Sequence, residues 1–179
     1  MKKIALAVLL ATGLMAADSG MYVGLDVGNT DYNIKASALG ISVEESYDDA
    51  SYTFKAGYYI DANSRVYASY QYIDVEDGDS AFYGVGYDYL IGNGALKPFV
   101  GAFVGYGSAE DDEGYVDMSG TVYGGQIGLN YAINENFSAE AGYRYMKSNM
   151  DDNIVESDIN VNIEIDEIKN WFVGVNYKF

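Results

Sequence analysis

Hydrophobic and polar residues alternate with a period of two in eight separate parts of this chain. The alternating segments are residues 21–27, 52–60, 65–72, 81–89, 97–106, 121–131, 137–145 and 171–179. Successive side chains of a β-strand point to opposite faces, so this pattern predicts eight strands, each with one apolar face. The last segment places Trp171, Val173, Val175, Tyr177 and Phe179 on its apolar face.

The two faces of the predicted strands differ in chemistry. The apolar faces carry no charged residue and end in tyrosines, whereas glycines, amides and charged side chains share the other faces. The charged residues on those faces are Asp26, Lys55, Arg65, Asp88, Lys97, Glu140, Arg144 and Lys178. A lipid-facing band with aromatic girdles has the composition of the apolar faces, so we expect these faces to point outward. The alternative is a soluble, lipocalin-like ligand-binding barrel with its apolar faces inside, because the period alone does not identify the inner face.

The connections between the predicted strands alternate in length. Short connections at 61–64, 91–96 and 132–136 alternate with long ones at 28–50, 73–80, 107–120 and 146–169. Barrels of the bacterial outer membrane have short turns in the periplasm and longer loops outside the cell. This pattern predicts both termini in the periplasm and the long loops on the extracellular side.

The first residues have the pattern of a secretory signal peptide. Lys2 and Lys3 precede an apolar run at residues 4–15, and Ala16 and Ala17 follow it. The run is shorter than the roughly 20 apolar residues that a membrane-spanning helix needs. We therefore expect a cleaved signal peptide at residues 1–17, followed by one barrel domain at residues 18–179.

Composition limits the functions open to the chain. Its formal net charge is -17, which becomes about -19 once Lys2 and Lys3 are removed, so we expect no binding to nucleic acid. The chain has no histidine and no cysteine. Their absence excludes histidine-dependent triads, cysteine nucleophiles and ordinary zinc sites, so we expect neither enzymatic activity nor a cofactor.

Four stretches carry a resemblance to a known family. They are KPFVGAFVGY at 97–106, GGQIGLNY at 124–131, AEAGYRY at 139–145 and WFVGVNYKF at 171–179. Together with the loop pattern, they resemble eight-stranded outer-membrane β-barrels of the OmpA/OmpX-like, "porin family" type. The resemblance implies an all-β, eight-stranded antiparallel up-and-down transmembrane barrel in the bacterial outer membrane, in contact with outer-membrane lipid and lipopolysaccharide.

The closing strand is similar to the terminal strands of such barrels, which end in an aromatic residue. The resemblance implies that its apolar face is an assembly signal read by the barrel-assembly machinery. The residues of this signal are Trp171, Val173, Val175, Tyr177 and Phe179.

A cluster of charges is expected inside the barrel. Asp26, Lys55, Glu140 and Arg144 fall at comparable heights on the first, second and seventh predicted strands. Asp26 and Lys55 lie on neighbouring strands and can pair, whereas Glu140 and Arg144 are about 13 Å apart along one strand. Gly174, which faces inward on the closing strand, leaves space for Arg144 to cross. Eight strands leave an interior just wide enough for side chains, so this cluster should fill the lumen.

The acidic residues are concentrated in the long connections, which hold 21 of the 27. Carboxylate oxygens bind divalent cations such as calcium. The candidate ligands are Glu110, Asp111, Asp112, Glu113, Asp151 and Asp152. A solvated rim that keeps the loops soluble is the alternative, because no loop has the spacing of a calcium-binding loop.

We expect a structural or adhesive role at the cell surface, with a host or cell-surface ligand as the candidate partner. A narrow passive channel for small solutes or ions remains the alternative, because charged side chains can also line a pore.

Overall fold

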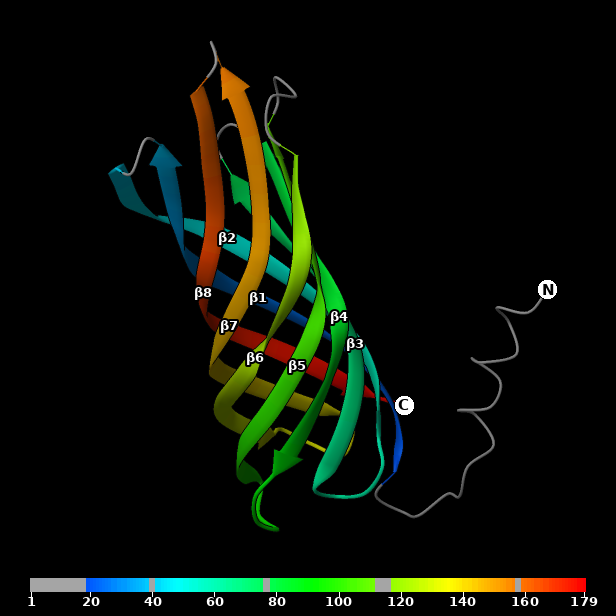
Figure 1. Cartoon of the computed structure of the whole chain (residues 1–179). Coiled ribbons are helices and arrows are strands. Elements are labelled where there is room, and N and C mark those ends of the chain that lie inside the picture. The colour runs from blue at the N-terminus through cyan, green and yellow to red at the C-terminus, as the bar shows by residue number, and fades with distance from the viewer. Residues whose placement is uncertain (1–18, 39–40, 76–77, 112–116, 157–158) are drawn as a thin grey trace, which may run out of the picture.

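Eight antiparallel strands close into one barrel in sequence order (Figure 1). The computed structural model describes residues 19–38, 41–75, 78–111, 117–156 and 159–179, so the predicted signal peptide lies outside the described residues. The strands are β1 Gly20–Ala38, β2 Ile41–Tyr59, β3 Ser64–Val75, β4 Gly78–Leu90, β5 Leu96–Asp111, β6 Asp117–Ala132, β7 Phe137–Glu156 and β8 Ile159–Lys178. The predicted all-β, eight-stranded barrel is confirmed. Within the described residues, no helix is long and apolar enough to cross a membrane.

The strands continue well beyond the predicted segments at one end of the barrel. β1 and β2 stay paired as far as Ala38 opposite Ile41, and β7 and β8 as far as Glu156 opposite Ile159. Strands occupy most of the connections predicted as long loops at 28–50, 73–80, 107–120 and 146–169, so this prediction was wrong for most of their length. Backbone N–H and C=O groups can pair along a sheet whether or not the side chains alternate, so pairing continues where the pattern fades. We call this end of the barrel the long-hairpin end.

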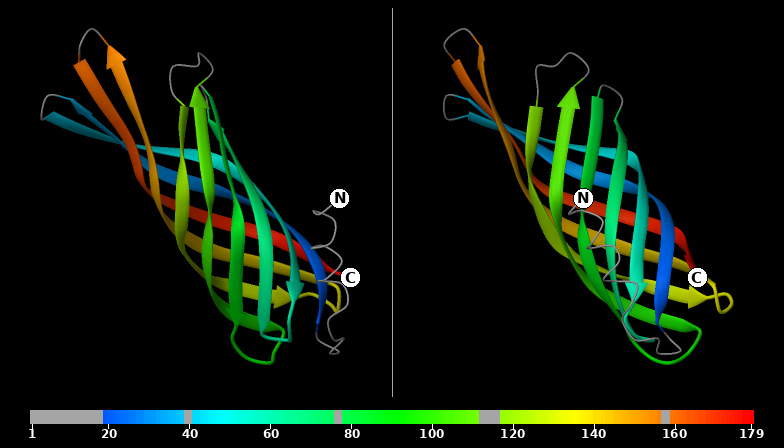
Figure 2. Two further views of the ribbon diagram at one scale, coloured as in Figure 1. Left: turned by 45° about the vertical axis from the view of Figure 1, so that its right-hand side comes forward. Right: turned by 90° about the vertical axis from the view of Figure 1, so that its right-hand side faces the viewer.

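The hairpins at this end separate into two groups. β3 pairs with β2 only as far as Asp74 opposite Ala50, so residues 41–49 of β2 extend past it. Figure 2 shows the ends of β1, β2, β7 and β8 leaning away from those of β3 to β6. The barrel therefore carries a projecting four-stranded sheet in the order β7, β8, β1 and β2.

Short turns join the strands at the opposite end, which we call the short-turn end. Gly92 has a φ of 100°, a left-handed conformation that favours glycine. The Asn63 side chain donates to the carbonyls of Leu90 at 2.6 Å and Gly92 at 2.8 Å. These bonds tie the turn after β2 to the turn after β4 and fix the rim of the barrel.

The faces of the strands point as predicted. Val104, Ile127 and Val175 are 50%, 60% and 54% exposed on the outer wall, whereas Arg65 and Asp88 are fully buried inside. The outer wall is an apolar band of aliphatic and aromatic side chains. A water-soluble barrel has the reverse arrangement.

The outward face of β8 helps to close the barrel against β1. Val175 lies opposite Leu25, and the Phe179 N–H donates to the Met21 carbonyl at 3.0 Å. The rings of Tyr177 and Phe179 lie edge to face, with centroids 5.1 Å apart. All five residues of the predicted assembly signal face outward and are exposed at least in part.

The role of this face in assembly remains a prediction. We expect Phe179→Ser, or deletion of Phe179, to reduce insertion into the outer membrane far more than Glu135→Ser in an exposed short turn. The variant loses the terminal ring and its contact with Tyr177. Quantifying folded protein in outer-membrane fractions checks this, and normal levels of the Phe179 variants would refute it.

Candidate functional site in the barrel lumen

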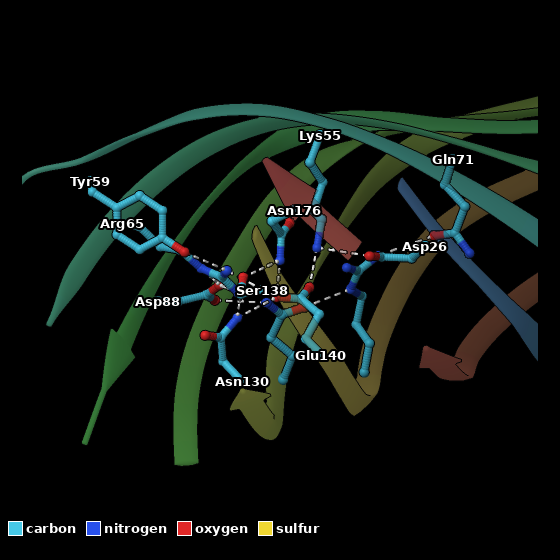
Figure 3. A network of polar contacts seen from close by, with 12 residues as sticks. Asp26, Lys55, Tyr59, Arg65, Gln71, Asp88, Asn130, Ser138, Glu140 and Asn176 are labelled. Carbon is cyan, nitrogen blue, oxygen red and sulfur yellow. Dashed lines mark hydrogen bonds and ion pairs between the residues drawn. The ribbon is translucent and has the colours of Figure 1, made fainter. Parts of the chain in front are cut away.

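Six charged side chains are buried inside the barrel, and Figure 3 shows how Asp26, Lys55, Arg65, Asp88 and Glu140 meet there. None of them is more than 4% exposed. They are Asp26, Asp88 and Glu140 with Lys55, Arg65 and Arg144. Their formal charges cancel, as burial of ionised groups requires. We call this set, with the amides that bond to it, the lumen network.

Glu140 on β7 is the centre of the network. Its Oε1 accepts a hydrogen bond from Lys55 Nζ, and its Oε2 accepts one from Arg65 Nη1 at 2.9 Å. Asn176 Nδ2 donates to the same Oε2 at 2.8 Å. One carboxylate therefore joins side chains from β2, β3, β7 and β8 across the lumen.

Arg65 and Asp88 form a second part of the network. They are direct cross-strand partners on β3 and β4. Arg65 Nε donates to Asp88 Oδ2 at 2.8 Å, and Gln126 Nε2 donates to the other carboxylate oxygen at 2.7 Å. Since Arg65 also bonds to Glu140, it connects the two halves of the network.

Lys55 and Asp26 form the ion pair that the sequence suggested, with Nζ 2.9 Å from Oδ1. The expectation that Gly174 leaves space for Arg144 was wrong. A Cβ on Gly174 would overlap the Asp26 carboxylate, so this glycine makes room for Asp26 and not for Arg144. Gly101 makes room for Asp88 in the same way.

Arg144 is held by amides and aromatic rings. Its Nε donates to Gln126 Oε1 at 2.9 Å, and Nη1 lies 3.4 Å from Gln71 Oε1. Its guanidinium carbon lies 5.7 Å from the Phe103 ring centroid and 5.3 Å from that of Phe172. Within the described part of the chain, no ion pair joins Arg144 to a carboxylate.

The structure thus brings three of the four predicted cluster residues, Asp26, Lys55 and Glu140, into direct contact. Arg144 belongs to the same network through Gln126. Sequence reasoning placed Arg65 and Asp88 on the inner faces but missed their central position. The sequence did contain a signal for this pair. Arg65 and Asp88 are the same number of residues from the centre of the 73–80 connection, so a tight hairpin there makes them cross-strand partners.

Apolar side chains close the lumen beyond the network. Toward the long-hairpin end, a buried cluster fills the interior. Its members are Ile73, Phe82, Phe103, Met118, Val122, Met146, Met150, Ile165 and Ile168. Six of them were missed, because the connections at 73–80, 107–120 and 146–169 were read as loops; they are Ile73, Met118, Met146, Met150, Ile165 and Ile168. Leu90, Phe99 and Phe172 form a smaller cluster beside the network.

A small cavity of about 150 Å³ opens at the short-turn end. Lys97, Lys178 and Asn130 are among its lining residues. Lys97 Nζ donates to the Ala62 carbonyl at 2.6 Å, and Asn130 Nδ2 lies 3.4 Å from Glu140 Oε2. The cavity therefore ends at the lumen network.

The candidate divalent-cation ligands fall at the edge of what the structure describes. Glu110 and Asp111 end β5, and Asp151 and Asp152 lie on β7, but their side chains are outside the described residues, as are Asp112 and Glu113 altogether. Cation binding by these carboxylates stays a prediction.

A specific cation site predicts saturable stabilisation by calcium or magnesium, because a ligand that binds only the folded state stabilises it by linkage. Thermal unfolding should be measured with divalent and monovalent salt at matched ionic strength. Equal responses to the two salts would eliminate a specific site, since screening alone depends on ionic strength.

Comparison with solved structures supports the same architecture. Neisserial surface protein A is 26% identical, with a TM-score of 0.61 over 90% of this chain and 99% of its own. The outer membrane protein OprG from Pseudomonas aeruginosa is 17% identical, with a TM-score of 0.62 over 90% and 97%. The N-terminal β-barrel domain of Pseudomonas aeruginosa OprF is 16% identical, with a TM-score of 0.56 over 88% and 97%. At these two lower identities, the likeness shows the fold alone.

No curated protein matches the chain. Residues 4–179 match the family described as "Outer membrane protein beta-barrel domain". With the apolar band outside and the charges inside, this match shows that the soluble, lipocalin-like alternative was wrong. The chain belongs to the outer membrane protein β-barrel domain family and is a barrel of the bacterial outer membrane.

Proposed function

We propose that this protein is a closed barrel that anchors its long hairpins at the cell surface, where it has a structural or adhesive role. The observation that carries this proposal is the lumen network, in which six buried charges and their amide partners cross the interior. In the proposed orientation, the termini and short turns lie in the periplasm and the long-hairpin end is extracellular.

The network favours a closed lumen for an energetic reason. A permeating ion would have to separate Glu140 from Lys55 and Arg65, which are bonded on both carboxylate oxygens. Separating a buried pair leaves uncompensated charges in a desolvated site. The apolar cluster toward the long-hairpin end adds a second barrier, because it offers no polar partner to a hydrated ion.

The projecting sheet supports a role outside the membrane. β1 and β2 remain paired beyond the apolar band, from Asp31 opposite Asp48 to Ala38 opposite Ile41. Tyr32 and Tyr47 stack across this hairpin with centroids 5.9 Å apart. A paired hairpin presents side chains at lower entropic cost than an unstructured loop. It is therefore suited to contact a host or cell-surface ligand.

Shortening this hairpin tests the proposal. Residues 32–47 are removed, and Asp31 is joined to Asp48 through an Asn-Gly turn, which suits a two-residue hairpin. We expect the barrel to assemble, as shown by folded mobility in unboiled gels, while attachment of expressing cells to host cells falls. A matched shortening of the β7–β8 hairpin shows which hairpin matters. Unchanged attachment in both variants would leave only a structural role.

The narrow passive channel remains a second candidate. The cavity at the short-turn end favours it, because Lys97 and Lys178 line an opening toward the lumen. A small anion could enter this cavity, but it would have to pass the network to cross the membrane. The conductance measurement at the end of the Discussion separates the two functions.

A further inference from the structure

The cavity at the short-turn end is the mouth of the lumen. Side chains of several strands and of the short turns line it, among them Tyr59 on β2, Lys97 on β5, Ser138 on β7 and Lys178 on β8. At about 150 Å³, it has room for a ligand of roughly ten non-hydrogen atoms or fewer. Its floor is the lumen network, so a small ligand can enter from the rim and go no further.

Lys97 is a half-buried cation with a neutral partner. Its Nζ donates to the Ala62 carbonyl at 2.6 Å, across the mouth of the barrel. Within the described ranges, no ion pair includes Lys97, whereas Lys55 and Arg65 are each paired with two carboxylates. Burial of a charge is costly unless a counter-charge compensates it. An ammonium group has three donors, so Lys97 has two more for an anion in the cavity.

Lys178 brings a second positive charge to the same side of the cavity. Its Nζ lies 5.5 Å from the centroid of the Tyr59 ring, which is at the end of β2. Ala62, which accepts from Lys97, is in the turn that follows β2, so both ammonium groups lie beside this turn. A recess lined by charges of one sign concentrates ions of the other sign. The mouth of the barrel therefore attracts anions, although the formal net charge of the chain is -17.

Ser138 adds a neutral donor at the floor of the cavity. Its Oγ accepts from Asn130 Nδ2 at 3.1 Å and lies 3.5 Å from Asn176 Nδ2, so amide donors occupy its acceptor positions. Both amides also bond to Glu140, which fixes them in place (Figure 3). In the described part of the chain, no acceptor takes the Ser138 hydroxyl proton. The lumen network thus holds this hydroxyl ready to donate to a ligand.

Few acidic residues oppose an anion at this site. Glu135 is the one acid among the described residues that line the cavity, and it is exposed in a short turn. Asp61 lies next to Ala62, but its carboxylate accepts the Asn63 N–H at 2.7 Å. The two lysines therefore leave the cavity with an excess of positive charge. Since Glu135 also repels anions of high charge, the arrangement suits a small anion of low charge.

We propose that this cavity binds one small oxyanion of low charge, a carboxylate or a phosphate. The ammonium groups of Lys97 and Lys178 bind its oxygens, and the Ser138 hydroxyl donates to it from the floor. Lysine acts as a point charge and lacks the planar fork of arginine, so the site selects for charge and size and accepts either chemistry. The proposal goes beyond a structural or adhesive role, because it gives the closed barrel a ligand at the end opposite its long hairpins.

NMR titration of the refolded mature barrel in zwitterionic detergent micelles tests the proposal. Sodium acetate and sodium phosphate are added separately near neutral pH, with sodium chloride at matched ionic strength as the reference. We expect saturable, one-site shifts of the Ala62, Lys97 and Ser138 amide resonances with at least one of the two oxyanions, and no saturable shift with chloride. Saturation by acetate alone would assign the site to carboxylates, and saturation by phosphate alone would assign it to phosphates.

Variants of the lining residues identify the groups that bind. Lys97→Gln should weaken binding about tenfold or more, because it removes a charge-assisted hydrogen bond. Lys178→Gln should also weaken it, and Ser138→Ala should do so by a smaller factor, because its hydroxyl is a neutral donor. Glu135→Gln should strengthen binding, because it removes the carboxylate that repels the anion. Glu135 is exposed in a turn, so this variant tests the proposal even where Lys97→Gln does not refold.

Lys35→Gln is the matched control. It removes one exposed positive charge on the β1–β2 hairpin, near the opposite end of β1 from the short turns, and should leave both titration curves unchanged. Equal shifts with the oxyanions and with chloride would mean that screening alone is observed, which would overturn the proposal. Unchanged affinity in both Lys97→Gln and Lys178→Gln would overturn it as well, as would equal weakening by Lys35→Gln.

Discussion

Replacing Glu140 with alanine should destabilise the barrel by about 3–5 kcal/mol, the usual cost of removing one partner from a buried ion pair. The reason is that Glu140 is bonded to both Lys55 and Arg65, and its removal leaves the network with an excess positive charge. Asn176 Nδ2 also loses its 2.8 Å acceptor. We therefore expect a larger effect here than at Asp26, whose described ion pair is with Lys55 alone.

Unfolding by urea in lipid vesicles measures this change. Glu135→Ala is the matched control, because Glu135 is exposed in a short turn and should change stability by no more than about 0.5 kcal/mol. Removing Lys55 and Glu140 together should cost less than the sum of the two single changes. Additive effects would mean that these side chains face open water and are not a desolvated pair.

An arginine at position 127 should also be strongly destabilising, by about 2–4 kcal/mol, because we expect Ile127 to face the acyl chains near mid-depth. Ile127 is 60% exposed on the outer wall and faces hydrocarbon in the proposed orientation. Its cross-strand neighbours are Val100 and Tyr143, neither of which carries a charge that could neutralise an arginine. The same refolding titration measures the effect.

Thr121→Arg on the same strand is the control. Thr121 is exposed and lies closer to the long-hairpin end, where water or headgroups can solvate an arginine, so it should cost no more than about 1 kcal/mol. A neutral Ile127→Arg would show that the outer wall at this height is not in contact with hydrocarbon.

The part of the barrel inside the membrane could be predicted from the sequence, because the bilayer requires apolar side chains on the outer face of each strand. Every outward side chain in the band is apolar or aromatic, so period-two alternation is preserved there and identifies eight strands. Beyond the band, water solvates the outer face and the constraint disappears. The extension of β7 therefore has polar residues in a row at Asp151, Asp152 and Asn153, and by sequence it cannot be told from a loop. The extension of β8 still alternates, because polar residues separate Ile159, Val161, Ile163 and Ile165, so it could have been recognised from the sequence.

The lumen network could be predicted only in part. The alternation of apolar and polar residues identifies which side chains face the lumen. The contact between Lys55 and Asp26 could be predicted because the first two strands are neighbours. Contacts across the lumen could be predicted only if the stagger of the strands in the closed barrel were known. Arg65 on β3 reaches Glu140 on β7, and no sequence pattern sets the relative height of two strands that are not neighbours. For the same reason, Gly174 was assigned to Arg144 although it accommodates Asp26.

The central claim is that side chains close the lumen, and single-channel recording in planar lipid bilayers tests it most directly. We predict no large, steady conductance from the intact, folded barrel, because the lumen network and the apolar cluster obstruct the interior. A large, steady conductance from the folded protein would contradict this claim and favour the channel.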